Sequence, residues 1–210
     1  MPVRMEASAP VRVDLAGGWT DVGPYPVDFG GEVVNFAINR RVFARMDSES
    51  GLDGAVFEFQ TPRGSGLGTS SAMNLALSAL TFPGGLENPA VLAEKAYVLE
   101  SKGGNMCGRQ DQWASAYGGF NHLLFIGDSV EVMPFEPMRS AKNWLKKHLI
   151  IAFSGKSRES GEMQKSVWDS YSRGDQNVSD GLHIIRGAAR LMANGPVSYT
   201  HLTLPTNREV

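Results

Sequence analysis

The sequence has 210 residues and a formal net charge of −2, so bulk charge gives no sign of a nucleic-acid or anionic-membrane partner. Its length suits one domain or two small ones, and 42% hydrophobic residues is ordinary for a globular protein. The single cysteine, Cys107, excludes an internal disulfide, and no apolar run resembles a signal peptide or a membrane span. We therefore expect a cytoplasmic protein.

The first sixty residues are predicted to be rich in β-strands. Val11, Val13 and Leu15 alternate with polar or small residues, which is the pattern of a half-buried strand. Further strands are expected over residues 33–38, 42–46 and 55–60. Glycine pairs at 17–18 and 30–31 mark turns before and between these strands.

A glycine-rich loop follows the strands and leads into a predicted helix. It reads Pro-Arg-Gly-Ser-Gly-Leu-Gly-Thr-Ser-Ser-Ala from Pro62 to Ala72, and apolar residues at helical spacing continue to Leu80. Glycines let a ligand approach the backbone, and the first turn of a helix carries unpaired N–H groups and a partial positive charge. The arrangement is typical of a phosphate site. The Walker and dinucleotide patterns both fail at Thr69, and a simple turn capped by Ser70 is the alternative interpretation.

Two acidic residues fall at predicted helix ends. Asn88, followed by proline, starts a helix in which Glu100 lies in the last turn, at the negative end of the dipole. A carboxylate there suggests a cation partner, but the spacing alone favours a solvated surface glutamate. Asp111 falls in the first turn of a short helix, where it either complements the dipole or lies beside a phosphate site. The spacing does not decide between these two interpretations.

The second half of the sequence is predicted to mix strands and helices. We expect a hairpin at 120–126 and 130–135, a strand at 149–153, and helices at 159–171 and 179–194, with Ser179 capping the last helix. Residues 138–144 are the best candidate for a domain boundary. Residues 197–210 lack periodicity and resemble the tail that mistranslated library sequence adds to unrelated gene models, so we interpret them as non-native.

Three segments together resemble the motifs of the GHMP sugar kinases. The first motif, the phosphate loop and the catalytic-aspartate segment of that family correspond to residues 9–21, 64–72 and 108–121. Within the family, Gly-Gly-Trp-Thr-Asp at 17–21 and Gly-Gly-Glu-Val-Val-Asn at 30–35 are most similar to the branch of L-fucokinase and D-glycero-D-manno-heptose 7-phosphate kinase. The resemblance covers about residues 2 to 194.

The resemblance implies a mixed α/β (α+β) fold. It predicts a β-rich N-terminal, ATP-binding domain at 1–143 with helices on one face, and an incomplete ferredoxin-like α+β domain at 144–196. It implies a cytoplasmic kinase that uses ATP and Mg²⁺ to phosphorylate a hydroxyl, expected to be the anomeric one. The expected acceptor is a sugar or sugar phosphate such as L-fucose or D-glycero-D-manno-heptose 7-phosphate.

The resemblance also assigns roles to individual residues. Asp111 would take the proton from the attacking hydroxyl or orient it, and Arg12 would neutralise charge near the reacting oxygens. Glu100 and Ser70 would bind Mg²⁺. Trp19 and Asp21 would contact the sugar, with Gln112 as a further candidate. The ATP phosphates would bind a loop formed by Gly64, Ser65, Gly66, Leu67, Gly68, Thr69, Ser70 and Ser71.

The sequence departs from the family pattern in two places. The stretch between Met46 and Pro62 is short, and the family's third Gly-rich motif is absent, so we expect a C-terminally truncated kinase. Two other functions stay open: a sugar- or nucleotide-binding fragment without turnover, and a serine hydrolase. The hydrolase would use Ser70 with His122 and Asp111, although a strand should then lead straight into the serine.

Overall fold

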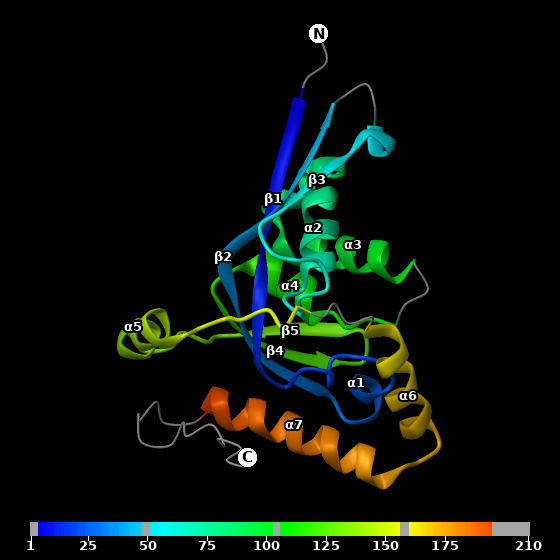
Figure 1. Ribbon diagram of the computed structural model, residues 1–210. Helices are drawn as coiled ribbons and strands as arrows, with labels where there is room; N and C mark the ends of the chain where they lie inside the picture. Colours follow the sequence, from blue (N-terminus) through cyan, green and yellow to red (C-terminus); the bar gives the residue numbers. More distant parts are fainter. Residues whose placement is uncertain (1–3, 48–50, 103–105, 156–159, 195–210) are drawn as a thin grey trace.

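An antiparallel sheet forms the centre of the computed structural model, which describes residues 4–47, 51–102, 106–155 and 160–194 (Figure 1). Four strands lie side by side in the order β1 (Arg4–Ala16), β2 (Gly31–Asp47), β4 (Phe120–Ile126) and β5 (Ser129–Met133). The fifth, β3 (Val56–Phe59), pairs with the second half of β2. The predicted mixed α/β architecture is confirmed, and every strand pairing in the described chain is antiparallel.

The long strand β2 organises the sheet. The strands predicted at 33–38 and 42–46 are one continuous strand of 17 residues. Its first half pairs with β4 and its second half with β3, while β1 pairs along both halves. The register of β1 shifts between Pro10 and Arg12 and again between Asp14 and Ala16. Such irregularities re-aim side chains, and here they flank two charged residues of the site described below.

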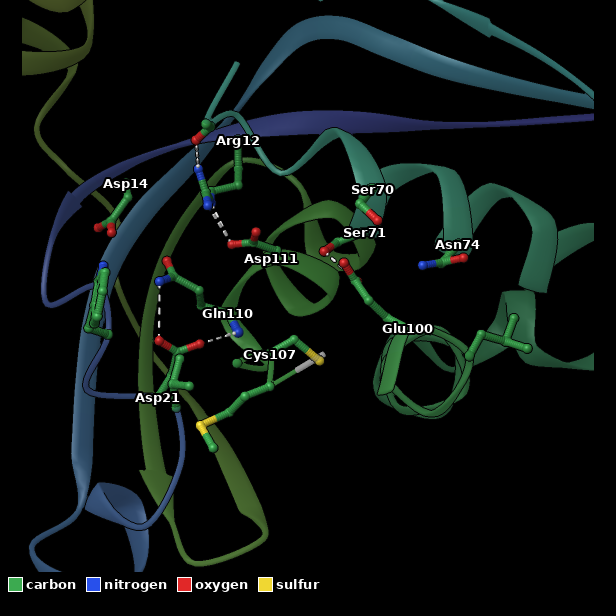
Figure 2. A pocket seen from close by; sticks show the side chains of 16 residues that line it. Arg12, Asp14, Asp21, Ser70, Ser71, Asn74, Glu100, Cys107, Gln110 and Asp111 are labelled. Atoms are coloured by element: carbon green, nitrogen blue, oxygen red, sulfur yellow. Dashed lines mark hydrogen bonds and ion pairs between the residues drawn. The ribbon is translucent and has the colours of Figure 1, made fainter. Parts of the chain in front are cut away.

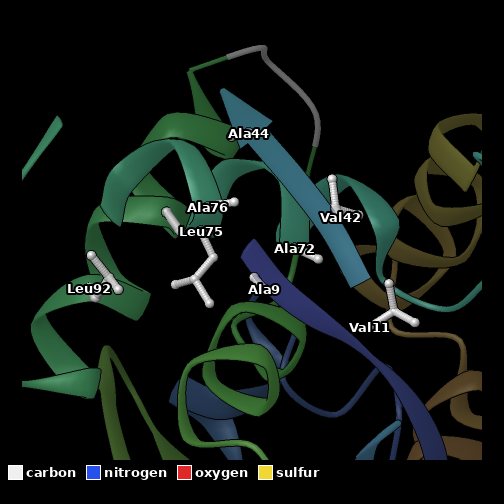
Figure 3. Close-up of a cluster of buried hydrophobic side chains, with 9 residues drawn as sticks. Ala9, Val11, Val42, Ala44, Ala72, Leu75, Ala76 and Leu92 are labelled. Carbon is white, nitrogen blue, oxygen red and sulfur yellow. The ribbon is translucent and has the colours of Figure 1, made fainter. Parts of the chain in front are cut away.

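Three helices cover one face of the sheet: α2 (Thr69–Thr81), α3 (Pro89–Ser101) and α4 (Gln110–Tyr117) (Figure 1). Leu75 and Ala76 of α2 pack against Val11 and Val42 of the sheet in a buried apolar cluster (Figure 3). A second cluster joins the sheet to α3 and α4, and it consists of Val33, Ala93, Trp113, Leu123 and Phe125. These two clusters fix the amino-terminal ends of α2 and α4 beside β1.

The other face of the sheet carries α7 (Gln176–Asn194), which the chain reaches through α5 (Arg139–His148) and α6 (Ser160–Ser172). Because neighbouring residues of a strand point to opposite faces, Glu32 points away from the cluster that contains Val33. The Glu32 carboxylate is 3% exposed and bonds His122 Nε2 at 2.9 Å and Arg190 Nε of α7 at 3.0 Å. A buried carboxylate with two nitrogen partners thus ties α7 to the sheet.

Short elements complete the fold. Helix α1 (Tyr25–Asp28) lies between β1 and β2, and 3₁₀ turns lie at 51–54 and 83–87. Asn88 caps α3 as predicted, because its Oδ1 accepts from the backbone N–H of Ala90 at 3.2 Å and of Val91 at 3.4 Å. None of the helices in the described part of the chain has the length and apolarity that a bilayer span requires.

Some sequence predictions for the second half are wrong. Residues 149–153 form no strand, and Ile150 is 88% exposed, because no neighbouring strand in the described chain offers them backbone partners. Helix α7 starts at Gln176, before the predicted cap at Ser179. The domain division at 143/144 falls inside α5 and stays a prediction. The tail at 197–210 lies outside the described residues.

The core between α2 and the sheet gives a first test of the fold. Leu75 is 3% exposed, so Leu75→Ala should leave a cavity and lower the free energy of unfolding by about 2–5 kcal/mol. Leu191→Ala is the matched control, because Leu191 is 75% exposed on α7 and its loss should change stability by at most about 0.5 kcal/mol. Urea unfolding followed by circular dichroism measures both, and equal losses would contradict this core.

Candidate active site

A cavity of about 520 Å³ opens where β1, the loop before α2, α3 and α4 meet (Figure 2). Its walls combine residues from all three segments that the sequence singled out. The first segment contributes Arg12, Asp14, Trp19 and Asp21; the glycine loop and α2 contribute Gly66, Ser70 and Ser71; the third contributes Gly108, Gln110 and Asp111, with Cys107 directly before it. Glu100 enters from the end of α3. The structure therefore brings together residues far apart in the sequence.

Arg12 connects the glycine loop to α4. Its Nε and Nη2 lie 2.7 and 2.6 Å from Asp111 Oδ1, and its Nη1 donates to Gly66 O at 2.8 Å. Its backbone N–H also donates to Leu67 O at 3.0 Å. Burial alone would lower the pKa of Arg12, but the carboxylates of Asp111 and Asp14 raise it, so the guanidinium stays charged.

The glycine loop ends in a helix start that no side chain caps. Gly68 is the N-cap of α2 with a left-handed φ of 69°, and no side chain bonds the first N–H groups, so the alternative of a turn capped by Ser70 is wrong. A Cβ on Gly68 would lie 3.1 Å from Asp111 Oδ2, so glycine is needed for both the conformation and the approach. Free N–H groups beside a positive helix end suit an anion.

Glu100 is held at the rim of the cavity by two donors. Ser71 Oγ donates to Glu100 Oε2 at 2.7 Å, and Gln112 Nε2 donates to the same oxygen at 2.7 Å. Gln112 is fully buried and is not among the residues that line the cavity. Its geometry is that of a support for Glu100, and the predicted sugar contact at Gln112 stays a prediction.

The wall opposite Glu100 contains Asp21 and Gln110. The Asp21 carboxylate is 4% exposed and accepts from the Gln110 backbone N–H at 3.0 Å and from Gln110 Nε2 at 3.2 Å. Trp19 is half-buried and lines the same wall. This side of the cavity presents carboxylates and an indole, which are groups that bind hydroxyls and the apolar faces of small rings.

Burial alters the chemistry of two groups here. Desolvation, together with the negative charges of Asp111 and Asp14, raises the pKa of Asp21 to about 6, and the hydrogen bond from the Gln110 backbone N–H opposes this rise. Burial, with nearby carboxylates, also raises the pKa of the Cys107 thiol to about 12. Cys107 is therefore a neutral thiol near pH 7, which is a poor nucleophile.

The serine-hydrolase alternative lacks its geometry. Strand β3 ends at Phe59, nine residues before Gly68, so no strand leads into Ser70. His122 lies in β4, bonds Glu32, and is not among the residues that line the cavity.

In the described ranges, no group of three or more His, Cys, Asp or Glu residues lies together in a way that could hold a metal ion.

Several of the lining residues, among them Asp14 and Gln110, were assigned no site role from the sequence. Asp14 sits two residues after Arg12 on a strand, and Gln110 immediately precedes Asp111. Strand alternation could have placed Asp14 on the same face as Arg12. No sequence signal could have favoured Gln110 over Gln112, because both are glutamines beside Asp111 in one helix.

The fold brings a glycine-rich loop opposite a wall of acidic residues. Comparisons with known proteins show which families share this fold and sequence. Residues 35–119 match the family model of the GHMP kinases N terminal domain. The chain is 25% identical over 237 residues to D-glycero-alpha-D-manno-heptose 7-phosphate kinase of Campylobacter jejuni, covering 87% of this chain and 68% of that protein. It is 25% identical over 235 residues to the bifunctional fucokinase/GDP-fucose pyrophosphorylase of Arabidopsis thaliana, covering 83% and 22%.

A solved structure supports the same conclusion. A D-glycero-D-manno-heptose 1-phosphate kinase from Bacteroides thetaiotaomicron superposes with a TM-score of 0.57 at 27% identity, over 68% of this chain and 63% of that one. Residues 35–119 of this chain therefore match the GHMP kinase N-terminal domain, and the chain is distantly similar to a heptose 7-phosphate kinase and a fucokinase. GHMP sugar kinases use ATP as their phosphoryl donor. The chain spans about two thirds of the length of the bacterial relatives.

The buried Asp21 predicts a pH-dependent stability. Its pKa rises from 3.8 in the unfolded chain to about 6 in the fold, so the folded state holds the proton more tightly and stability falls as pH rises through this window. At about 1.36 kcal/mol per pKa unit, ionised Asp21 costs the fold about 3 kcal/mol above pH 6. Asp21→Asn should therefore be more stable than the wild type at pH 8.

The measurement is urea unfolding of both proteins at pH 4.5 and pH 8. The difference in the free energy of unfolding between Asp21→Asn and the wild type should be smaller at pH 4.5, where the wild-type carboxyl is protonated in the folded state. Asp169→Asn is the control, since Asp169 is exposed on α6 and its variant should follow the wild type at both pH values. A stability difference for Asp21→Asn that is independent of pH would contradict the raised pKa.

Proposed function

We propose that this protein is an ATP-dependent sugar kinase that transfers the γ-phosphate of ATP to a hydroxyl, with the anomeric hydroxyl as the expected position. One observation carries the proposal. Arg12 binds both Gly66 O in the glycine loop and the carboxylate of Asp111, and this contact supports a phosphate loop that works beside a base. Phosphoryl transfer depends on this alignment of donor and acceptor more than on covalent chemistry.

The residues around Arg12 suit the steps of such a transfer. Asp111 Oδ2 faces the start of α2, and Arg12 occupies Oδ1, so one carboxylate oxygen remains to accept the proton of the attacking hydroxyl. The hydroxyl oxygen forms a bond to the γ-phosphorus as the bond to the β-phosphate oxygen breaks, and ADP leaves. The Arg12 guanidinium and the N–H groups of α2 counter the negative charge of the transferring group.

The rim of the cavity offers ligands for Mg²⁺, and the phosphate oxygens of a bound nucleotide would complete the coordination of the ion. Mg²⁺ in kinases binds through one or two carboxylates together with phosphate oxygens and water. Glu100 supplies the carboxylate, and exposed Ser70 in the first turn of α2 supplies a hydroxyl, with Ser71 beside it. The hydrogen bonds from Ser71 and Gln112 both go to Glu100 Oε2, so Oε1 is left for a ligand. The ion would neutralise charge on the phosphates.

The acceptor is proposed to lie against Trp19, Asp21 and Gln110. Asp21 is anchored by two hydrogen bonds from Gln110, so its orientation is set before a sugar arrives. L-Fucose and D-glycero-D-manno-heptose 7-phosphate are the first acceptors to test, because the named relatives act on a heptose 7-phosphate and carry a fucokinase activity.

The wider organisation is also a proposal. We place the ATP-binding domain at 1–143 and the start of a ferredoxin-like α+β domain at 144–196, in a cytoplasmic protein. Helices α6 and α7 supply the helical part of that second domain, and no strand follows Met133 within the described ranges. A kinase of this kind needs only small-molecule partners, namely ATP, Mg²⁺ and the sugar.

A panel of sugars and sugar phosphates with ATP and Mg²⁺, read by coupled ADP release, tests the function directly. Sugar-dependent ADP release and a phosphorylated product in mass spectrometry are the expected results. Binding of ATP and sugar without ADP release from any acceptor would favour the alternative, a binding fragment without turnover. Absence of both binding and release would contradict the proposal.

Asp111→Asn tests the base. The amide keeps the shape of the carboxylate but cannot accept the proton, so kcat should fall by about 10²- to 10⁴-fold. ATP binding, measured by equilibrium titration with a fluorescent analogue, should persist because the asparagine Oδ1 can still accept from Arg12, which holds the glycine loop through Gly66 O. Glu131→Gln, an exposed acid on β5, is the matched control and should keep full turnover. Near-normal kcat in Asp111→Asn would remove Asp111 from the mechanism.

A further inference from the structure

We propose that Trp168 of α6 is a positioning residue for acceptor recognition, acting through Trp19. The inference rests on the proposed function, because it takes the wall formed by Trp19 and Asp21 as the acceptor side of the cavity. Trp168 does not line the cavity. It lies behind Trp19, and nothing in the three sequence motifs points to it.

Trp19 has an unusual backbone that requires support. Its φ is 80°, and it is the one non-glycine residue with a positive φ within the described ranges. A bulky side chain in the left-handed region is unfavourable and persists only where surrounding packing holds it. Because the indole lines the cavity, the position of this loop decides where an acceptor ring can rest.

Trp168 supplies that packing. Its side chain is 2% exposed, and the two indole centroids are 6.5 Å apart with the rings tilted by 31°. It belongs to a buried cluster with Val22, Tyr25 and Leu182, and Trp19 packs against the same cluster. A Cβ on Gly23 would lie 3.2 Å from the Trp168 ring, so the turn after Asp21 passes directly over the indole.

Helix α7 packs against the other end of the loop that carries Trp19. A Cβ on Gly17 would lie 2.9 Å from Cβ of Ala189, which is fully buried on α7. Leu182 of α7 meets Trp168 in the cluster described above. The loop 17–23, which carries Trp19 and Asp21, is therefore held at Gly17 by α7 and at Gly23 by α6. The last two helices form the back of the acceptor wall.

The contact depends on the shape of the indole rather than on a hydrogen bond. Trp168 Nε1 is buried with no partner among the described residues. Phenylalanine would keep part of the aromatic surface and remove an unsatisfied donor, whereas leucine would remove the flat ring. A graded effect, larger for leucine than for phenylalanine, is the signature of positioning through packing.

The kinetic experiment compares Trp168→Leu and Trp168→Phe with the wild type on the best acceptor of the sugar panel. We expect the KM for the acceptor to rise about 10-fold in Trp168→Leu, and less in Trp168→Phe, while the KM for ATP stays within about twofold. Trp144→Phe is the matched control, because Trp144 is 49% exposed on α5. Unchanged acceptor KM in folded Trp168→Leu would overturn the proposal.

A second measurement needs neither substrate nor turnover. The protein is labelled with 5-fluorotryptophan, and the Trp19 fluorine resonance is assigned from its loss in Trp19→Phe. In Trp168→Phe the Trp19 resonance should shift or broaden, and in Trp144→Phe it should not. An unmoved Trp19 resonance overturns the positioning role whatever the acceptor. Absent turnover with a shifted resonance would instead count against the kinase function alone.

Discussion

The arrangement of this site depends on one side chain, Arg12. Its guanidinium binds Gly66 O and Asp111 Oδ1, and its backbone N–H binds Leu67 O, so a single strand residue fixes both the glycine loop and the start of α4. The ion pair is well shielded, with side-chain exposures of 11% and 24%. Loss of either partner would leave a largely desolvated charge, which is far more damaging than loss of an exposed pair.

The two walls of the cavity have different origins in the fold. The wall proposed to bind phosphate is built locally, from the glycine loop, the helix that follows it and the end of α3. The wall proposed to bind the acceptor is built from residues far apart in the sequence, because the loop at 17–23 rests on α6 and α7. A change in α6 or α7 can therefore reach the second wall without touching the first.

The sequence predicted the local elements well because their signals are local. The hairpin of β4 and β5, the Asn88 cap and the glycine loop each depend on a few neighbouring residues, and all three lie where expected. The strand predicted at 149–153 is absent because a strand needs a partner, which no local pattern supplies. Gln110 and Trp168 could not be found either, since their roles arise from contacts with residues far away in the chain.

The uncapped start of α2 has a consequence for stability under the proposed function. The first N–H groups of a helix need partners from side chains, water or a ligand, and α2 begins at a left-handed glycine without a side-chain cap. An anion that binds only the folded state stabilises it by mass action. The proposed nucleotide would therefore protect the first turn of α2 from local unfolding and proteolysis.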